Sequence, residues 1–302
     1  MNRNERHLFF GVLLVLAAAL GVMLLQDALA DRPQEIRRVA VLLDGTDETY
    51  WQNFRLGVDK AARERNVDVR YVARYEGDVS AAQAGQLRRE WEDGELDGVI
   101  LVPVDGAALA ETLEDAPADL AVTVAGPGLP GVDGVCAISA SQEELGRRLA
   151  DAVADSGAAS CTVVLSGREG ASALHRYQGL KEGLRARGVA WKTVTAASVD
   201  ALPEPNGQPV AALEPAMTEA LCSWGGPVYG VGASTNILNG LETGAAAALV
   251  LQSDYDAGYL SLLSVLERLE GGQPQDRILD CYTVTAENMF TDPMDQILFP
   301  VT

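Results

Sequence analysis

The stretch from Arg38 to Asn66 constrains the fold more than any other part of this chain. It begins with an apolar run, Val39 to Leu43, which is typical of a buried strand. A polar loop follows, and then Phe54, Val58 and Ala61 recur at helical spacing on one stripe. Strand, loop and helix in this order form the first half of a βαβ unit. Ligands in such folds bind at the carboxyl ends of the strands.

The same alternation continues along the chain. Further strands are expected over residues 67–73, 96–104, 121–125, 132–138, 161–165, 189–194, 228–231, 247–251 and 277–284. Helices are expected over residues 79–92, 107–114, 142–154, 171–187, 216–224, 237–243 and 255–270. The stretch 195–209 holds three prolines, through which no helix can run, and the residues after 284 are expected to be irregular. The pattern predicts an α/β fold with parallel sheets. Because it occurs twice, it predicts two lobes of similar build with a cleft between them.

An uncharged apolar run, residues 8–25, precedes the first strand. It is just long enough to span a bilayer as a helix, and the arginines before it place the N-terminus in the cytoplasm. Two interpretations stay open. The run is either a signal peptide cleaved after Ala28-Leu29-Ala30 or an uncleaved membrane anchor, which its length slightly favours. Both predict that the rest of the chain lies outside the cytoplasmic membrane, at the cell surface or in the periplasm.

Charge and motif content exclude several function classes. The chain has 23 Lys and Arg against 43 Asp and Glu, a net charge of −20 that repels phosphate backbones and argues against nucleic-acid partners. None of the four cysteines forms a CxxC pair, and His175 is the one histidine beyond the apolar run, so no metal site is expected. No catalytic sequence motif is present, so we expect neither an enzyme nor a cofactor.

Four segments carry a resemblance to a known family. They are RVAVLLDGTDETYWQNFRLGVDKAA (38–62), DGVILVPVD (97–105), the R-x-x-G pattern in RYQGL (176–180) and ALVLQSDYDAGYLSLLSVLERLEGG (248–272). With them the chain resembles the periplasmic sugar-binding proteins of the ribose-binding type, the substrate-binding components of ABC importers, over about residues 38–292. The resemblance implies two doubly wound lobes that are joined by three crossing segments and close on the ligand by a hinge.

The resemblance also implies where the lobes and crossings lie. The first lobe would hold residues 36–137 plus 254–279, and the second 138–253 plus 280–302. The crossings would fall near 136–139, 251–253 and 280–283. Cys136 and Cys281 would then lie near neighbouring crossings, so a disulfide between them is a hypothesis.

Five residues match the family's ligand contacts, Tyr50, Trp51, Asp105, Arg176 and Gln252, and Glu214 stands at a sixth contact position. The two aromatic rings would pack on the apolar faces of a sugar ring, and the charged and amide groups would bind its hydroxyls. Glu214 stands where the family has Asn, and Gly232 stands where it has an Asp.

Each of these positions also has a plain structural interpretation. One of the two aromatic residues could belong to the core. Asp105 could cap the following helix, and Glu214 could be a first-turn acid that the helix dipole favours. Arg176 could pair with the acidic surface of the chain.

The resemblance implies a solute-binding protein that delivers a small sugar-like ligand to an ABC permease. The alternative is a membrane-anchored sensor of the same fold, which would signal ligand occupancy to a histidine kinase or another partner.

Overall fold

The computed structural model describes residues 13–21, 23, 36–43, 49–72, 79–93, 96–129, 131–167, 169–202 and 204–301. The chain divides into two compact units, Met1–Ile36 and Arg37–Thr302. In the first unit, residues 13–21 and 23 are helical and exposed, and the rest of the expected apolar helix at 8–25 lies outside the described residues. Within the described residues, no helix combines the length and the apolar character that crossing a membrane requires.

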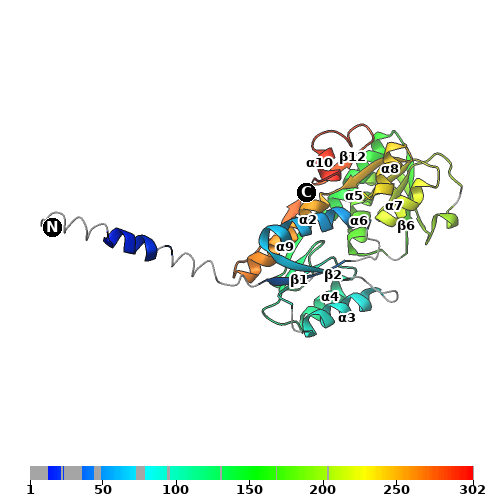
Figure 1. The fold of residues 1–302 in the computed structure, drawn as a ribbon. Coiled ribbons are helices and arrows are strands. Elements are labelled where there is room, and N and C mark those ends of the chain that lie inside the picture. Colours follow the sequence, from blue (N-terminus) through cyan, green and yellow to red (C-terminus); the bar gives the residue numbers. More distant parts are fainter. Residues whose placement is uncertain are drawn as a thin grey trace, which may run out of the picture. The chain divides into compact units, whose positions relative to one another are not determined.

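The first sheet of the second unit has the strand order β11-β5-β4-β3-β1-β2, and all its pairs are parallel. Its strands are β1 (Arg37–Leu42), β2 (Val67–Val72), β3 (Gly98–Leu101), β4 (Ala121–Val124), β5 (Cys136–Ala140) and β11 (Arg277–Leu279). One apolar cluster joins α2 (Gln52–Arg65) and α9 (Asp254–Leu269) to this sheet, and another joins α3 (Val79–Glu92) and α4 (Gly106–Leu113) to it (Figure 1). Strands β3 and β4 are buried along their whole length because helices cover both faces.

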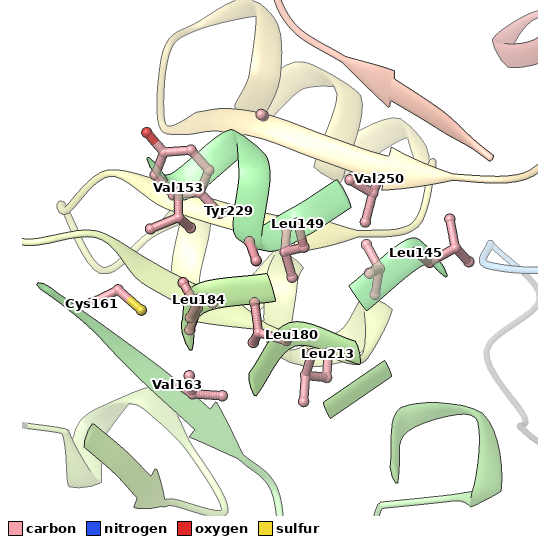
Figure 2. Close-up of a cluster of buried hydrophobic side chains, with 14 of the residues drawn as sticks. Leu145, Leu149, Val153, Cys161, Val163, Leu180, Leu184, Leu213, Tyr229 and Val250 are labelled. Carbon is pink, nitrogen blue, oxygen red and sulfur yellow. The ribbon is translucent and has the colours of Figure 1, made fainter. Parts of the chain in front are cut away.

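The second sheet has the order β12-β10-β9-β8-β6-β7. Its strands are β6 (Ser160–Leu165), β7 (Ala190–Thr195), β8 (Val210–Ala212), β9 (Val228–Val231), β10 (Ala246–Leu251) and β12 (Tyr282–Val284). The edge strand β12 runs antiparallel to β10, which the sequence pattern did not predict. Figure 2 shows the core between this sheet and two helices, α5 (Gln142–Asp155) and α6 (Ala171–Ala186). A second cluster joins the sheet to α7 (Pro215–Cys222), α8 (Thr235–Glu242) and α10 (Met294–Leu298).

The chain passes between the two sheets at three places: after β5, between β10 and α9, and between β11 and β12. The predicted α/β class with two doubly wound lobes is therefore confirmed. The single strand expected over 277–284 is wrong, because the chain crosses at Asp280 and Cys281 and gives each sheet a short edge strand. The first sheet includes all of β5, and so extends to Ala140, beyond the expected boundary at residue 137.

The proline-rich stretch 195–209 contains only one 3₁₀ turn, η1 (Val199–Ala201), among its described residues. The expectation that no α-helix runs there is met over the described positions. The end of the chain is less irregular than expected, because α10 buries Met294 and Leu298 in the second lobe's core.

Each lobe contains one pair of helices whose backbones nearly touch at glycines. In the first lobe, a Cβ on Gly57 of α2 would lie 2.0 Å from the carbonyl oxygen of Tyr255 on α9, well inside contact distance. In the second lobe, a Cβ on Gly179 of α6 would lie 1.9 Å from the carbonyl oxygen of Glu143 on α5. Only glycine permits such an approach. The Gly of the R-x-x-G pattern is thus explained by helix packing.

Candidate functional site: the cleft between the lobes

The carboxyl ends of strands from both lobes approach one another beside the crossings. Val104 follows β3 of the first lobe, and Gly170 caps the N-terminus of α6 in the second. A Cβ placed on Gly170 would be in ordinary van der Waals contact with the carbonyl oxygen of Val104, at 3.7 Å. The loop that carries Asp105 and the helix that carries Arg176 therefore begin at facing positions, which is where such folds bind ligands.

The packing of α6 on α5 fixes the position of Arg176. A Cβ on Gly146 of α5 would lie 2.0 Å from the carbonyl oxygen of Arg176, so the backbones of the two helices pack directly against each other at this residue. The half-buried guanidinium donates from Nε to the carbonyl oxygen of Ser172 at 3.2 Å, one turn back along α6. The adjacent His175 is exposed and contacts the Glu143 carboxylate of α5 through Nδ1. This contact lowers the pKa of Glu143 below its usual range.

Gln252 lies in the second crossing and ties it to the first. Its Oε1 accepts a hydrogen bond from the backbone N–H of Ala140 at 2.7 Å, and its Nε2 donates to Oδ1 of Asp254 at 3.2 Å. Burial raises the pKa of Asp254 to about 6, against the opposing effects of the Gln252 hydrogen bond and the positive charge of Arg176. The hydrogen-bonded pair of Gln252 and Asp254 therefore lies within the electrostatic reach of Arg176, which comes from α6.

A cavity of about 290 Å³ lies at the first crossing and is lined by residues of both lobes. Its lining residues are Gly126, Pro127, Gly128, Ala137, Ser139, Ala140, Ser141, Gln142, Glu143, His175, Asp276, Arg277 and Ile278. The buried Gln142 donates to Ser139 Oγ at 3.1 Å and to the Ala140 carbonyl at 3.0 Å, so its amide connects two other lining residues of the cavity. None of the six predicted ligand contacts lines this cavity. It adjoins them through Ala140, whose N–H binds Gln252, and through His175, which precedes Arg176.

The two predicted aromatic contacts are half-buried and pack in different directions. Tyr50 packs against the apolar cluster of the second lobe that includes Met294 and Leu298. Trp51 packs against the first lobe's cluster and meets Phe54 edge-on, with ring centroids 5.6 Å apart. Residues 44–48, which lead into this pair, lie outside the described residues. The stacking of both rings on one sugar stays a prediction.

Asp105 and Glu214 both stand at the N-termini of helices. Asp105 Oδ1 accepts from the backbone N–H groups of Ala107 and Ala108, at 3.0 and 3.1 Å, so it caps α4. Glu214 is the N-cap of α7, and its side chain makes no capping hydrogen bond. Capping leaves the Asp105 carboxylate further acceptor sites. The ligand-binding roles of these residues stay predictions.

The structure decides the state of the four cysteines. All four are free thiols, and the hypothesised Cys136–Cys281 disulfide is wrong. Cys136 donates to the carbonyl oxygen of Gln275 at 3.0 Å in the first lobe, whereas Cys281 contacts the carbonyl oxygen of Ser141 at 3.8 Å. Burial raises the pKa of Cys161 to about 11, which makes it an inert thiol. No cluster of three or more potential metal ligands occurs among the described residues.

Sequence reasoning missed two side chains of this region. Asp254 stands two positions after Gln252 in the quoted segment 248–272, and a carboxylate so close to a predicted contact was a usable signal. His175 adjoins Arg176 in sequence, but as a single histidine it was not expected to form a metal site or to have another role. Its pairing with Glu143 depends on helix packing and left no signal in the sequence.

Comparisons with known proteins agree with the two-lobe fold. The family model described as "Periplasmic binding protein domain" matches residues 39–273. A carbohydrate transporter solute-binding protein from Agrobacterium radiobacter, solved with D-arabinose, is 18% identical, with a TM-score of 0.78 over 87% of this chain and 99% of that one. An ABC transporter solute-binding protein from Agrobacterium vitis with bound D-fucose is 17% identical, with a TM-score of 0.77 over 87% of this chain and 100% of that one.

A third similar structure is the XylFII–LytSN complex, at 12% identity and a TM-score of 0.70, over 84% of this chain and 99% of that one. No curated protein matches the chain significantly. At these identities the similar structures establish the fold alone. The family model covers most of the chain, and so this chain belongs to the periplasmic binding protein domain family.

Proposed function

We propose that this chain is an extracytoplasmic solute-binding protein, and not an enzyme, which captures a small sugar-like ligand between its lobes for an ABC importer. The observation that carries the proposal is the match to the periplasmic binding protein domain over residues 39–273. Two similar solved structures hold D-arabinose and D-fucose, which supports a sugar as the ligand class. The first lobe would comprise residues 36–140 plus 254–279 and the second residues 141–253 plus 280–302, and they would close by a hinge at the crossings.

The proposed contacts are Tyr50, Trp51 and Asp105 from the first lobe, facing Arg176 and Glu214 from the second, with Gln252 at the crossing. The cross-lobe approach of Val104 and Gly170 supports this placement, and so does the electrostatic coupling of Arg176 to the Gln252–Asp254 pair. Arg176 and Asp105 would bind hydroxyls, and an aromatic ring would pack on the apolar face of the sugar.

A thermal-shift screen against neutral pentoses and hexoses tests the function, because a ligand that binds only the folded state raises Tm. We expect at least one sugar to raise Tm and to bind in calorimetry. Trp51→Ala and Arg176→Ala should each weaken binding at least tenfold. Arg185→Ala, at an exposed position in the last turn of α6, is the matched control and should bind as the unaltered chain does. Unchanged affinity in both site variants would show that the ligand binds elsewhere.

A second candidate is a sensor that passes ligand occupancy to a signalling partner. The XylFII–LytSN complex supports it, because a protein of this fold is there joined to another protein. Genes for a permease and an ATPase beside this one would favour the importer, and genes for a kinase and a regulator would favour the sensor.

We also propose that residues 8–25 direct the chain to the membrane and remain as an anchor. The uncharged run and the arginines before it support this proposal. The chain should sediment with membranes, and mass spectrometry should recover its N-terminal peptide. A mature chain that begins at Asp31 would show instead that the run is a cleaved signal peptide.

A further inference from the structure

Asp254 is the first residue of α9 and directly follows the second crossing. Its carboxylate is half-buried and takes one hydrogen bond from Gln252 Nε2. Both polar atoms of the Gln252 amide are thereby engaged within the protein, because its Oε1 already accepts from Ala140. A carboxylate offers about four acceptor positions, so Asp254 retains capacity for ligand hydroxyls. The Gln252 amide keeps one N–H and one lone pair for a ligand, whereas the Asp254 carboxylate keeps more acceptor positions.

Helix capping does not account for this carboxylate. Ser253 already caps α9 by accepting from the backbone N–H of Asp256 at 3.2 Å. Asp256, in the same first turn, is exposed and supplies the negative charge that a helix N-terminus favours. Asp254 adds a second charge at a position where burial disfavours it, and it is the one described carboxyl group whose pKa is clearly raised. Perturbed groups of this kind concentrate at functional sites.

Arg176, which comes from α6 of the opposite lobe, is a charged group that acts on Asp254. Arg176 alone would make this part of the cleft attractive to anions. The negative charge of Asp254 opposes that attraction. A second negative charge brought next to Asp254 would be repelled at short range in partly desolvated surroundings.

We propose that Asp254 is a specificity-determining residue, whose carboxylate accepts hydrogen bonds from the hydroxyls of a neutral sugar beside Arg176 and rejects sugars that carry a carboxylate. The inference rests on the proposed function and names the ligand class of the same cleft: uncharged polyhydroxylated rings, with uronic acids excluded.

The test compares neutral sugars with uronic acids of the same ring. D-Fucose, D-galactose and D-galacturonate differ only at C6, and D-glucose and D-glucuronate form a second set. Calorimetry is done at pH 7.5 on the full chain, on Asp254→Asn and on Asp256→Asn. The amide introduced by Asp254→Asn keeps the shape of the side chain and the acceptor for Gln252 but removes the charge. Asp256→Asn removes the same charge from an exposed position of the same helical turn.

For the unaltered chain we expect a neutral sugar to bind at least tenfold more tightly than its uronic acid. Asp254→Asn should reduce this ratio of the two affinities at least tenfold, and Asp256→Asn should leave the ratio unchanged. Lowering the pH from 7.5 to 5 should also narrow the ratio in the unaltered chain, since Asp254 then takes up a proton while uronic acids stay ionised. The ratio in Asp254→Asn should not respond to pH in this way.

Two results would overturn the inference while leaving the proposed function intact. In the first, a neutral sugar and its uronic acid bind the unaltered chain equally well. In the second, the neutral sugar is preferred but Asp254→Asn keeps the full ratio. If no neutral sugar binds the unaltered chain, the proposed function fails, and the inference fails with it.

Discussion

Gly146 of α5 lies so close to Arg176 of α6 that a Cβ on the glycine would fall 2.0 Å from the arginine's carbonyl oxygen. The reciprocal approach occurs three residues further along α6, where Gly179 meets the carbonyl oxygen of Glu143. The position of the Arg176 backbone therefore depends on the absence of a side chain at Gly146 of the neighbouring helix.

Gly146→Ala should destabilise the protein. Alanine gains about 1 kcal/mol of helix propensity over glycine, but overpacking at this contact should cost about 1–3 kcal/mol or more and move α6. Urea unfolding should show the loss, and calorimetry should show weaker sugar binding because Arg176 is displaced. The control is Gly85→Ala in α3, where a Cβ would meet only Arg89 Nη1 at 3.8 Å. This variant should be as stable as the unaltered chain or slightly more so. Equal stability of both variants would contradict the packing argument.

Asp105 can be tested as a cap and as a ligand contact separately. Asp105→Ala should cost about 0.5–2 kcal/mol of stability, because α4 loses the acceptor for two backbone N–H groups. Asp105→Ser keeps a capping oxygen and should restore most of that stability. We expect Asp105→Ser to bind the sugar at least tenfold more weakly, because the serine side chain is shorter and carries no charge. Full sugar affinity in the stable Ser variant would reduce Asp105 to a helix cap.

Asp254→Asn should make the protein more stable at neutral pH. The pKa of Asp254 is about 6 in the folded chain and about 3.8 for an ordinary aspartate, so the folded state holds more protons between these values. The free energy of unfolding of the unaltered chain, relative to that of the Asn variant, should therefore fall by at most about 3 kcal/mol as the pH rises through this range. Near pH 4 the two free energies should be equal.

Urea unfolding of both proteins from pH 4 to pH 7.5 measures this difference, with Asp256→Asn as the exposed control. A difference in unfolding free energy that stays constant with pH would show that folding does not raise the pKa of Asp254.

Asn53 of α2 donates from Nδ2 to the carbonyl oxygen of Leu298 at 3.1 Å, and so links the first lobe to α10 of the second. If the lobes separate to release the ligand, this bond must break. Asn53→Ala should therefore raise the rate of sugar release several-fold and cost about 0.5–1.5 kcal/mol of stability. Stopped-flow fluorescence measures the release rate, and Gln52→Ala, at the exposed neighbouring position, is the control. Equal release rates in the two variants would show that this contact does not resist opening.

The sequence by itself determined the fold class and most of the elements. Helix α3 has the predicted bounds, 79–92, and β9 the predicted bounds, 228–231. These predictions succeed because the apolar period of a helix or strand is set by residues within one or two turns of one another. The resemblance carried by the segment 248–272 also pointed to Gln252 before its surroundings were known.

Only the tertiary structure decided which distant residues meet. It divided the apolar stretch 277–284 between two sheets, which periodicity cannot do because both halves read as strand. It bonded Gln252 to Ala140, 112 positions away, and brought Asp254 under the influence of Arg176. It also packed Tyr50 against the opposite lobe. Local patterns show which face of a helix or strand is apolar. They do not show which element packs on that face, nor which charge a buried group keeps, because both depend on how the packed lobes exclude water.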